Sequence, residues 1–443
     1  MVSSVPNVTR SSHADSKGII LYCSFILFGL AQLLPWNVYM KSIPYIRMRL
    51  GDAPTAPLIA GFMPSAFTAC NFLTTLVLVG LRWDELLMDA PMRTMIGMAG
   101  NAILMVVMVV IIVPDFESTL LFILVISVAS LAGIVTSFLM KGLLGTVARF
   151  PSHLTPALVV GQALAGLFIS VASVITTASS KASPTDATGP IAYFSAGAIV
   201  LSVSFAVYLL SYTKNKYFRS CLVSSLESSG TLPMTFAGVF SVFQRIKWLS
   251  FGLTVTLGTT VSLFTTFITA PRQYPTEDAI KYLFTPLSFV AYDFGDVIGR
   301  WAPAIRALAA HPRSKLMLTS PYLRLVVFAP LFIVLAPVSI SGISRSLVTI
   351  VPFNHNDVIY YCLALLFGLS NGYLTTLLLM HAPTVAVVKR PLLIVDNAES
   401  KESADNMMDE GKEREMSGAI LGLFLNIGLL VGSLSNFLWR VVL

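Results

Sequence analysis

The chain has 443 residues, of which 55% are hydrophobic and only 12% are charged. Water-soluble domains carry about 25% charged residues, so this composition excludes a soluble protein of this length and predicts an integral membrane protein. The formal net charge of +7 does not indicate nucleic-acid binding. The Lys and Arg residues are scattered through short connections, where membrane topology accounts for them.

Apolar stretches long enough to cross a bilayer, each as a helix of about 20 residues, follow one another along the chain. They are continuous rather than alternating, which favours a helical bundle over a β-barrel. The eleven predicted spans cover residues 18–40, 57–81, 92–113, 119–147, 155–179, 190–212, 248–270, 281–304, 316–339, 357–380 and 417–439. The first lacks a clear small-residue cleavage site and is expected to be a signal-anchor helix. We therefore predict an all-α polytopic membrane protein.

Two longer polar segments divide this series. The predicted organisation is a cytoplasmic N-terminal tail (1–17), a six-helix bundle (18–212), a basic cytoplasmic central loop (213–247) and a five-helix bundle (248–443) with an acidic loop at 388–416. The composition of the acidic loop suggests disorder or a short amphipathic helix. A division into six and five spans is typical of transporters that bind substrate near the midplane between two halves.

The distribution of Lys and Arg predicts a cytoplasmic N-terminus, and an odd number of spans then places the C-terminus on the other side. The first connection opposes this bias, because it holds Lys41, Arg47 and Arg49. The sequence leaves open whether the protein lies in the plasma membrane or in an endomembrane such as that of a vacuole.

The most informative charged residues are Asp296 and Arg300, in the segment YDFGDVIGR. Charge inside a bilayer is costly and usually serves a substrate or ion path. Residues four apart share one face of a helix, so both side chains can point into the bundle. Two interpretations stay open and are compatible: an ion pair that braces the fold, and a pair beside the substrate.

Five motifs occur in an order and spacing that resemble the equilibrative nucleoside transporter family. They are LLPWN (33–37), GQALAG (161–166), DxxGR (296–300), FGLSNGYL (367–374) and SGAILGLFLNIGLLVG (417–432). The resemblance implies a fold similar to the major facilitator architecture with one span missing from the second half. It also implies passage of nucleosides, with nucleobases as an alternative, by alternating access.

The resemblance places Asp296 and Arg300 at the ribose, where a carboxylate accepts from hydroxyls and a guanidinium donates to ribose oxygens. Trp36 and Asn37 resemble the pair that the family carries near its outer gate and cavity, and Met40, one turn on, is a further candidate. Trp36 can equally be an interfacial aromatic anchor.

Two other polar residues within the spans have open roles. Asn371 is either substrate-facing or an interhelical hydrogen-bond partner, and we favour the interhelical bond. Gln162 near the start of the fifth span fits a gating role or a structural one.

The chain departs from the family pattern at three positions. Met140 stands where many relatives carry a Gln that contacts the base, Lys141 follows where a small residue is usual, and Asp293 replaces the usual Asn. An isolated ammonium group at this depth is costly, so we expect Lys141 to pair with Asp293. Asp293 and Asp296 are also candidates for proton coupling, and the sequence leaves facilitative and proton-coupled transport open.

No metal or other cofactor is expected, because the five His and four Cys residues form no cluster with metal-ligand spacing. The expected partners are nucleosides or nucleobases and the lipid bilayer, without an obligate protein partner. An enzyme would call for clustered histidines or a nucleophile motif, which the sequence lacks. The remaining alternative is a major-facilitator-type carrier of another small polar solute.

Overall fold

The structure is a computed structural model. It describes residues 8–80, 88–147, 149–150, 154–179, 187–228, 236–269, 278–305, 315–335, 357–387 and 399–442. Every regular element in these ranges is a helix, which confirms the predicted all-α class. The long helices are α1 (Val8–Leu50), α2 (Ile59–Gly80), α4 (Ala90–Ile112), α5 (Ser118–Val147), α6 (Leu154–Ser179), α7 (Thr188–Lys214), α9 (Phe236–Leu263), α10 (Asp278–Trp301), α11 (Lys315–Leu335), α13 (Asp357–Ala386) and α14 (Glu399–Val442).

Within the described ranges, nine helices are long and apolar enough to cross a membrane. They are α1, α2, α4, α5, α6, α7, α9, α13 and α14, and α11 contributes a shorter apolar helix at Leu318–Val334. Helix α10 lies among them but is more polar, because it carries Asp293, Asp296 and Arg300. The count of eleven spans stays a prediction, since α10 and α11 are not among these nine.

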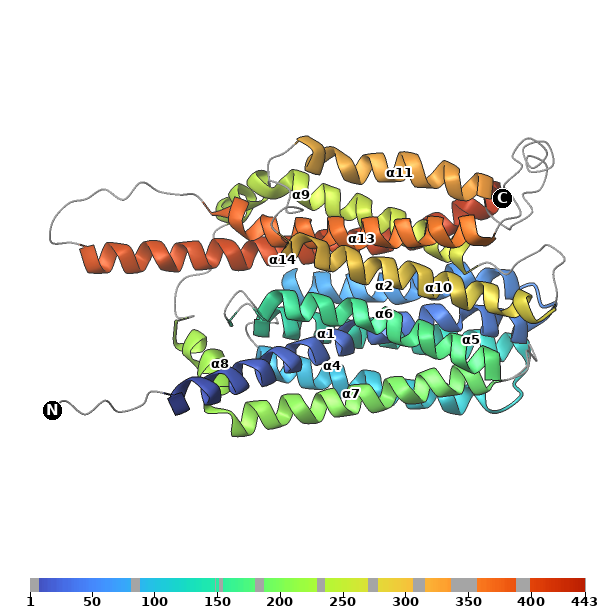
Figure 1. The fold of residues 1–443 in the computed structure, drawn as a ribbon, viewed down its shortest axis with the longest axis horizontal. Coiled ribbons are helices and arrows are strands. Elements are labelled where there is room, and N and C mark those ends of the chain that lie inside the picture. Colours follow the sequence, from blue (N-terminus) through green and yellow to red (C-terminus); the bar gives the residue numbers. More distant parts are fainter. Residues whose placement is uncertain are drawn as a thin grey trace.

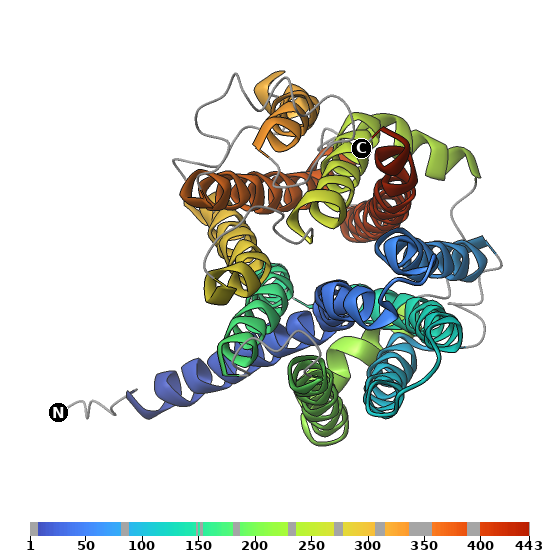
Figure 2. The same ribbon diagram turned by 90° about the vertical axis from the view of Figure 1, so that its right-hand side faces the viewer.

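The helices run side by side along the long axis of the molecule (Figure 1). Seen end on, α1 to α7 form one group and α9 to α14 form another (Figure 2). The two groups meet where α1 and α6 face α10, and where α2 faces α14. At the second contact, Thr68 and Ser433 hydroxyls lie 2.7 Å apart, and Asn426 donates to Thr75 over 3.2 Å.

Helix α1 is longer than the predicted first span, which ended at residue 40. The apolar pattern resumes with Ile43, Ile46 and Leu50, all at most 2% exposed, and these side chains hold the extra turns against the bundle. Lys41 is therefore a helical, buried residue and not part of a connection. At the helix end, Arg49 forms an ion pair with Asp115 over 2.7 Å.

The predicted central loop is also largely helical. Helix α7 continues to Lys214, and a further helix, α8 (Lys216–Ser228), precedes α9. The side chain of Asn215 caps α8 by accepting from the backbone N–H groups of Tyr217 and Phe218, over 3.0 and 3.2 Å. Phe218 and Leu222 anchor the helix, because both are at most 1% exposed.

Of the predicted acidic loop, residues 388–398 lie outside the described ranges. From Glu399 onward the segment is the first part of α14, which projects beyond the neighbouring helices (Figure 1). The expected short helix is therefore wrong in its extent, because this helical segment is continuous with the last span. Glu413 of α14 joins Arg245 of α9 in an ion pair of 2.9 Å.

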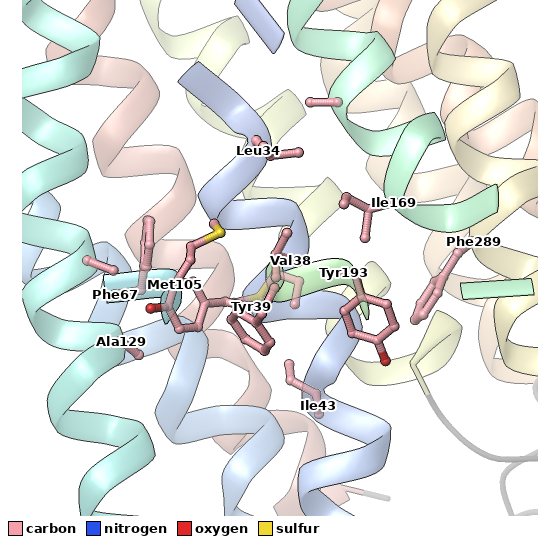
Figure 3. Packing of buried hydrophobic residues seen from close by; sticks show 14 of the residues in the cluster. Leu34, Val38, Tyr39, Ile43, Phe67, Met105, Ala129, Ile169, Tyr193 and Phe289 are labelled. Atoms are coloured by element: carbon pink, nitrogen blue, oxygen red, sulfur yellow. The ribbon is translucent and has the colours of Figure 1, made fainter. Parts of the chain in front are cut away.

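The apolar core of the first group is built around the middle of α1 (Figure 3). The Tyr39 ring packs edge-on against Phe194 with centroids 5.5 Å apart, and it lies 6.0 Å from the Phe67 ring. Leu34, Val38 and Tyr39 are fully buried. This packing sets the rotation of α1 about its axis, and it thereby turns Asn37 and Lys41 toward α6 and α10.

Candidate functional site

Polar side chains gather at the junction of the two helix groups, inside helices that are otherwise apolar. Charged groups in such a setting persist only with partners. The cluster comprises Gln32, Asn37, Lys41, Gln162, Ser170, Thr260, Asp293, Asp296, Arg300, Arg324, Ser370 and Asn371. Its hydrogen bonds form two networks, one around Asp296 and one around Asp293, which lie one turn apart on α10.

Asp296 and Arg300 form the ion pair at its centre. Arg300 Nε donates to Asp296 Oδ2 over 2.9 Å, and the two side chains are 8% and 9% exposed. The predicted sharing of one helix face is therefore confirmed. Arg300 Nη1 also reaches α6, where it donates to Gln162 Oε1 over 3.1 Å and to the Val159 carbonyl over 3.4 Å. The pair thus joins α10 to the first helix group.

Asn371 and Gln162 extend the pair in opposite directions. Asn371 Nδ2 donates to Asp296 Oδ1 over 2.7 Å, and Asn371 Oδ1 accepts from Thr260 over 2.7 Å. The interhelical bond that we favoured for Asn371 is present, and its acceptor is the carboxylate of Asp296. Gln162 Nε2 donates to Gln32 Oε1 of α1 over 3.1 Å. Both oxygens of Asp296 therefore accept hydrogen bonds.

Asp293 is paired with Lys41, and the expected pairing with Lys141 is wrong. Lys41 Nζ lies 2.6 Å from Asp293 Oδ2, with side-chain exposures of 0% and 7%. The same ammonium donates to the Gly166 carbonyl over 2.6 Å and to Asn37 Oδ1 over 3.2 Å. Ser170 of α6 makes a short hydrogen bond to the same carboxylate oxygen.

The reason for the error is the length of α1. With the first span ending at residue 40, Lys41 was expected in a connection and was not considered as a partner. Lys141 and Met140 lie half-buried on α5, which packs against α2 and α4, whereas Asp293 faces α1 and α6. The apolar residues after Lys41 were the signal that could have placed this lysine inside the bundle.

Arg324 on α11 is the second residue that sequence reasoning missed. It is 3% exposed, and it donates to Ser370 Oγ, the Thr256 carbonyl and Thr260 Oγ1 over 2.7–2.8 Å. Its guanidinium also lies 4.2 Å from the Phe367 ring centroid, within cation–π range. A lone Arg inside the apolar stretch 316–339 was the available signal.

The three candidates from the predicted first span separate in space. Asn37 belongs to the cluster, since it accepts from Lys41 and donates to the Leu33 carbonyl over 3.0 Å. Trp36 packs edge-on against Phe67 with ring centroids 5.4 Å apart. Met40 is 1% exposed within the apolar core. The structure therefore brings Asn37, and not Trp36 or Met40, to the charged groups.

Among the residues that the structure describes, no three His, Cys, Asp or Glu side chains lie close enough to hold a metal ion. The charges of the cluster are Lys41, Arg300 and Arg324 against Asp293 and Asp296. Three cations and two carboxylates give the cluster a net positive charge. This balance matters for the binding of a substrate and for any coupling to protons.

Membrane-spanning helices in two groups, with a charged cluster buried at their junction, define a membrane transporter. A family model described as "Nucleoside transporter" matches residues 123–231 and 220–390, which is more than half of the chain. The protein belongs to the nucleoside transporter family, so the resemblance drawn from the motifs is confirmed.

Three similar curated proteins are named as transporters and align over almost their full length. Human equilibrative nucleoside transporter 2 is 24% identical over 95% of this chain and 96% of its own. Human equilibrative nucleoside transporter 1 is 23% identical over 98% of this chain and 100% of its own. Equilibrative nucleotide transporter 8 of Arabidopsis thaliana is 22% identical over 95% of each chain. The prediction of a transporter and not an enzyme is confirmed.

Solved transporter structures are more distant. The nucleoside transporter NupG aligns over 94% of this chain and 90% of its own, with 10% identity and a TM-score of 0.47. The xylose transporter XylE from E. coli aligns over 97% of this chain and 96% of its own, with 12% identity and a TM-score of 0.48.

Proposed function

We propose that this protein carries nucleosides across a membrane and binds the ribose at Asp296 and Arg300. The observation that carries this proposal is the hydrogen-bonding capacity that the buried pair keeps. Arg300 Nη2 donates to no residue in the described part of the chain, so its two N–H groups are available. Each oxygen of Asp296 accepts one bond from a side chain and can accept another. Vicinal hydroxyls need this combination of donor and acceptor.

The hydrogen bonds between the two helix groups support alternating access. Lys41 to Asp293 and Arg300 to Gln162 both cross the junction, so they must break when the groups separate there. Lys41 would then keep Asn37 and Gly166, which belong to its own group. Asp293 would lose both Lys41 and Ser170 and would meet water. We infer that the bonds hold the closed arrangement on this side of the site.

The charge balance favours facilitative over proton-coupled transport. Protonation of either carboxylate would leave three cations facing one carboxylate in a medium of low dielectric, where uncompensated charge is costly. Both carboxylates are also held by charge-assisted hydrogen bonds. We infer that transport follows the nucleoside gradient and is not coupled to protons.

The structure also supports a cytoplasmic N-terminus. The first connection opposed the charge bias through three basic residues, but Lys41 is buried and paired inside α1. One of the three therefore no longer counts as a loop charge, and the remaining distribution favours the orientation predicted from the sequence.

Uptake into proteoliposomes tests the ribose assignment. We expect saturable uptake of radiolabelled adenosine and uridine, and weaker uptake of their 2′,3′-dideoxy counterparts. Arg300→Ala should reduce ribonucleoside uptake about 10- to 100-fold, since it removes charge-assisted donors worth roughly 1.5–3 kcal/mol. It should reduce dideoxynucleoside uptake less. Arg245→Ala, which changes a half-buried, ion-paired arginine of α9 outside the cluster, is the matched control and should retain uptake.

Normal ribonucleoside uptake by Arg300→Ala would refute the ribose assignment. If the wild-type protein took up free nucleobases and discriminated against nucleosides, the nucleobase alternative would replace the proposal.

A further inference from the structure

Arg324 poses a physical problem. It is buried on α11, and none of the described carboxylates is in direct contact with it. An unpaired buried charge destabilises a protein strongly. Within the described ranges, the guanidinium contacts hydroxyl groups, carbonyls and an aromatic face. One of those hydroxyls leads to the carboxylate of the candidate ribose site.

The connection runs through two side chains. Arg324 Nη1 donates to Thr260 Oγ1 over 2.8 Å, Thr260 donates to Asn371 Oδ1 over 2.7 Å, and Asn371 Nδ2 donates to Asp296 Oδ1 over 2.7 Å. All four residues are at most 7% exposed, so water does not substitute for any link. The chain of bonds joins the guanidinium to the carboxylate, with every donor pointing the same way.

The direction of this chain depends on Arg324. The Thr260 hydroxyl has one proton and two acceptors in range, Asn371 Oδ1 at 2.7 Å and the Thr256 carbonyl at 2.8 Å. Arg324 Nη1 donates to that carbonyl over 2.7 Å and also to the Thr260 oxygen. A hydroxyl proton aimed at that carbonyl would lie close to the cationic N–H group of the arginine, so repulsion favours donation to Asn371 Oδ1, which is also the nearer acceptor.

The orientation of the Asn371 amide follows. With its oxygen held by Thr260, the amide presents its NH₂ group to Asp296. Without the Thr260 bond the amide is held from the carboxylate side alone, and a rotation that turns its oxygen toward a carboxylate oxygen costs less. The neutral donor to Asp296 would be lost and replaced by a repulsive contact.

We propose that Arg324 is a positioning residue for the nucleoside site. It acts through Thr260 and Asn371, and it orients the Asp296 carboxylate that receives the ribose hydroxyls. This inference rests on the proposed function, because it assigns a use to the ribose site. It also makes a claim about hydrogen-bond coupling that holds without any substrate.

The transport experiment compares ribonucleosides with 2′,3′-dideoxynucleosides. Arg324→Met and Thr260→Val should each lower the preference for adenosine over dideoxyadenosine about tenfold, through KM, since one buried polar group is left unsatisfied. Arg324→Lys should restore much of it, because an ammonium can donate to both Thr256 and Thr260. Lys214→Met, at the exposed end of α7 and outside the cluster, is the control and should keep the wild-type preference.

A role in packing alone would lower the uptake of both substrates equally and would not be rescued by lysine. A folded Arg324→Met protein with the wild-type preference would overturn the proposal. If that variant does not fold, Thr260→Val decides, because it deletes the relay hydroxyl at nearly constant volume.

A second readout needs no transport. In a thermal-unfolding cycle, the midpoint shifts of Arg324→Met and Asn371→Leu should be non-additive, because both break one chain of bonds. Additive shifts would refute the coupling of Arg324 to Asp296 through Thr260 and Asn371, whatever the substrate is. If the wild-type protein showed no ribose preference but the shifts were coupled, the ribose site would be refuted and the relay retained.

Discussion

Replacing Lys41 with methionine tests the ion pair that joins the two helix groups. Lys41 and Asp293 are almost completely buried, so the change leaves a carboxylate with only Ser170 as a partner. Removing one member of a buried pair costs about 3–5 kcal/mol, because the other charge stays desolvated. With about 2 cal/mol/K of unfolding entropy per residue, this corresponds to a fall of at least about 3 °C in the unfolding midpoint.

The assay is thermal unfolding of the purified protein in detergent, with two further variants. Asp293→Asn in the Lys41→Met background removes both charges and should recover most of the lost stability, since an amide still accepts from Ser170. Lys214→Met, at the exposed end of α7, is the control and should change the midpoint by less than about 1 °C.

The result that would refute the reasoning is a Lys41→Met midpoint equal to that of the wild type. A double variant less stable than either single one would equally contradict it, because the cost would then not arise from an unpaired charge.

Three further outcomes follow from the structure. Adenosine uptake should change less than about twofold between pH 5.5 and 7.5, and a rise of tenfold at acid pH would establish proton coupling instead. Gly372→Ala should abolish folded protein in a detergent-stability screen, because its Cβ would collide with the Asp296 backbone carbonyl of α10. Gly422→Ala, which meets open space, should be tolerated. Arg245→Ala should cost at most about 1 kcal/mol in unfolding free energy, although it breaks the ion pair with Glu413; a larger loss would show that the pair holds α14 in place.

The close approach of α10 and α13 shows what local patterns can predict. Gly368 and Gly372 let the backbone of α13 lie directly against the carbonyls of Tyr292 and Asp296. Small residues at such spacing indicate close helix packing. They do not indicate which helix is the neighbour, and only the assembled structure shows that α13 brings Asn371 to the Asp296 carboxylate.

Composition and local spacing determined the class of this protein, the approximate extents of its helices and the pairing of Asp296 with Arg300. Each of these depends on residues near one another in the chain, since apolar runs and i, i+4 positions set hydropathy and helix faces. The order of the five motifs along the chain likewise indicated the family, and this order can be seen without knowing which motifs are in contact.

Tertiary structure alone decided which cation faces which carboxylate. Lys41 is 252 positions from Asp293, and Arg324 reaches Asp296 only through side chains on two other helices. These partnerships depend on how far α1 continues, how each helix is rotated and which helices cross. Burial then makes them obligatory, because a charge withdrawn from water is stable only beside the partner that the packing supplies.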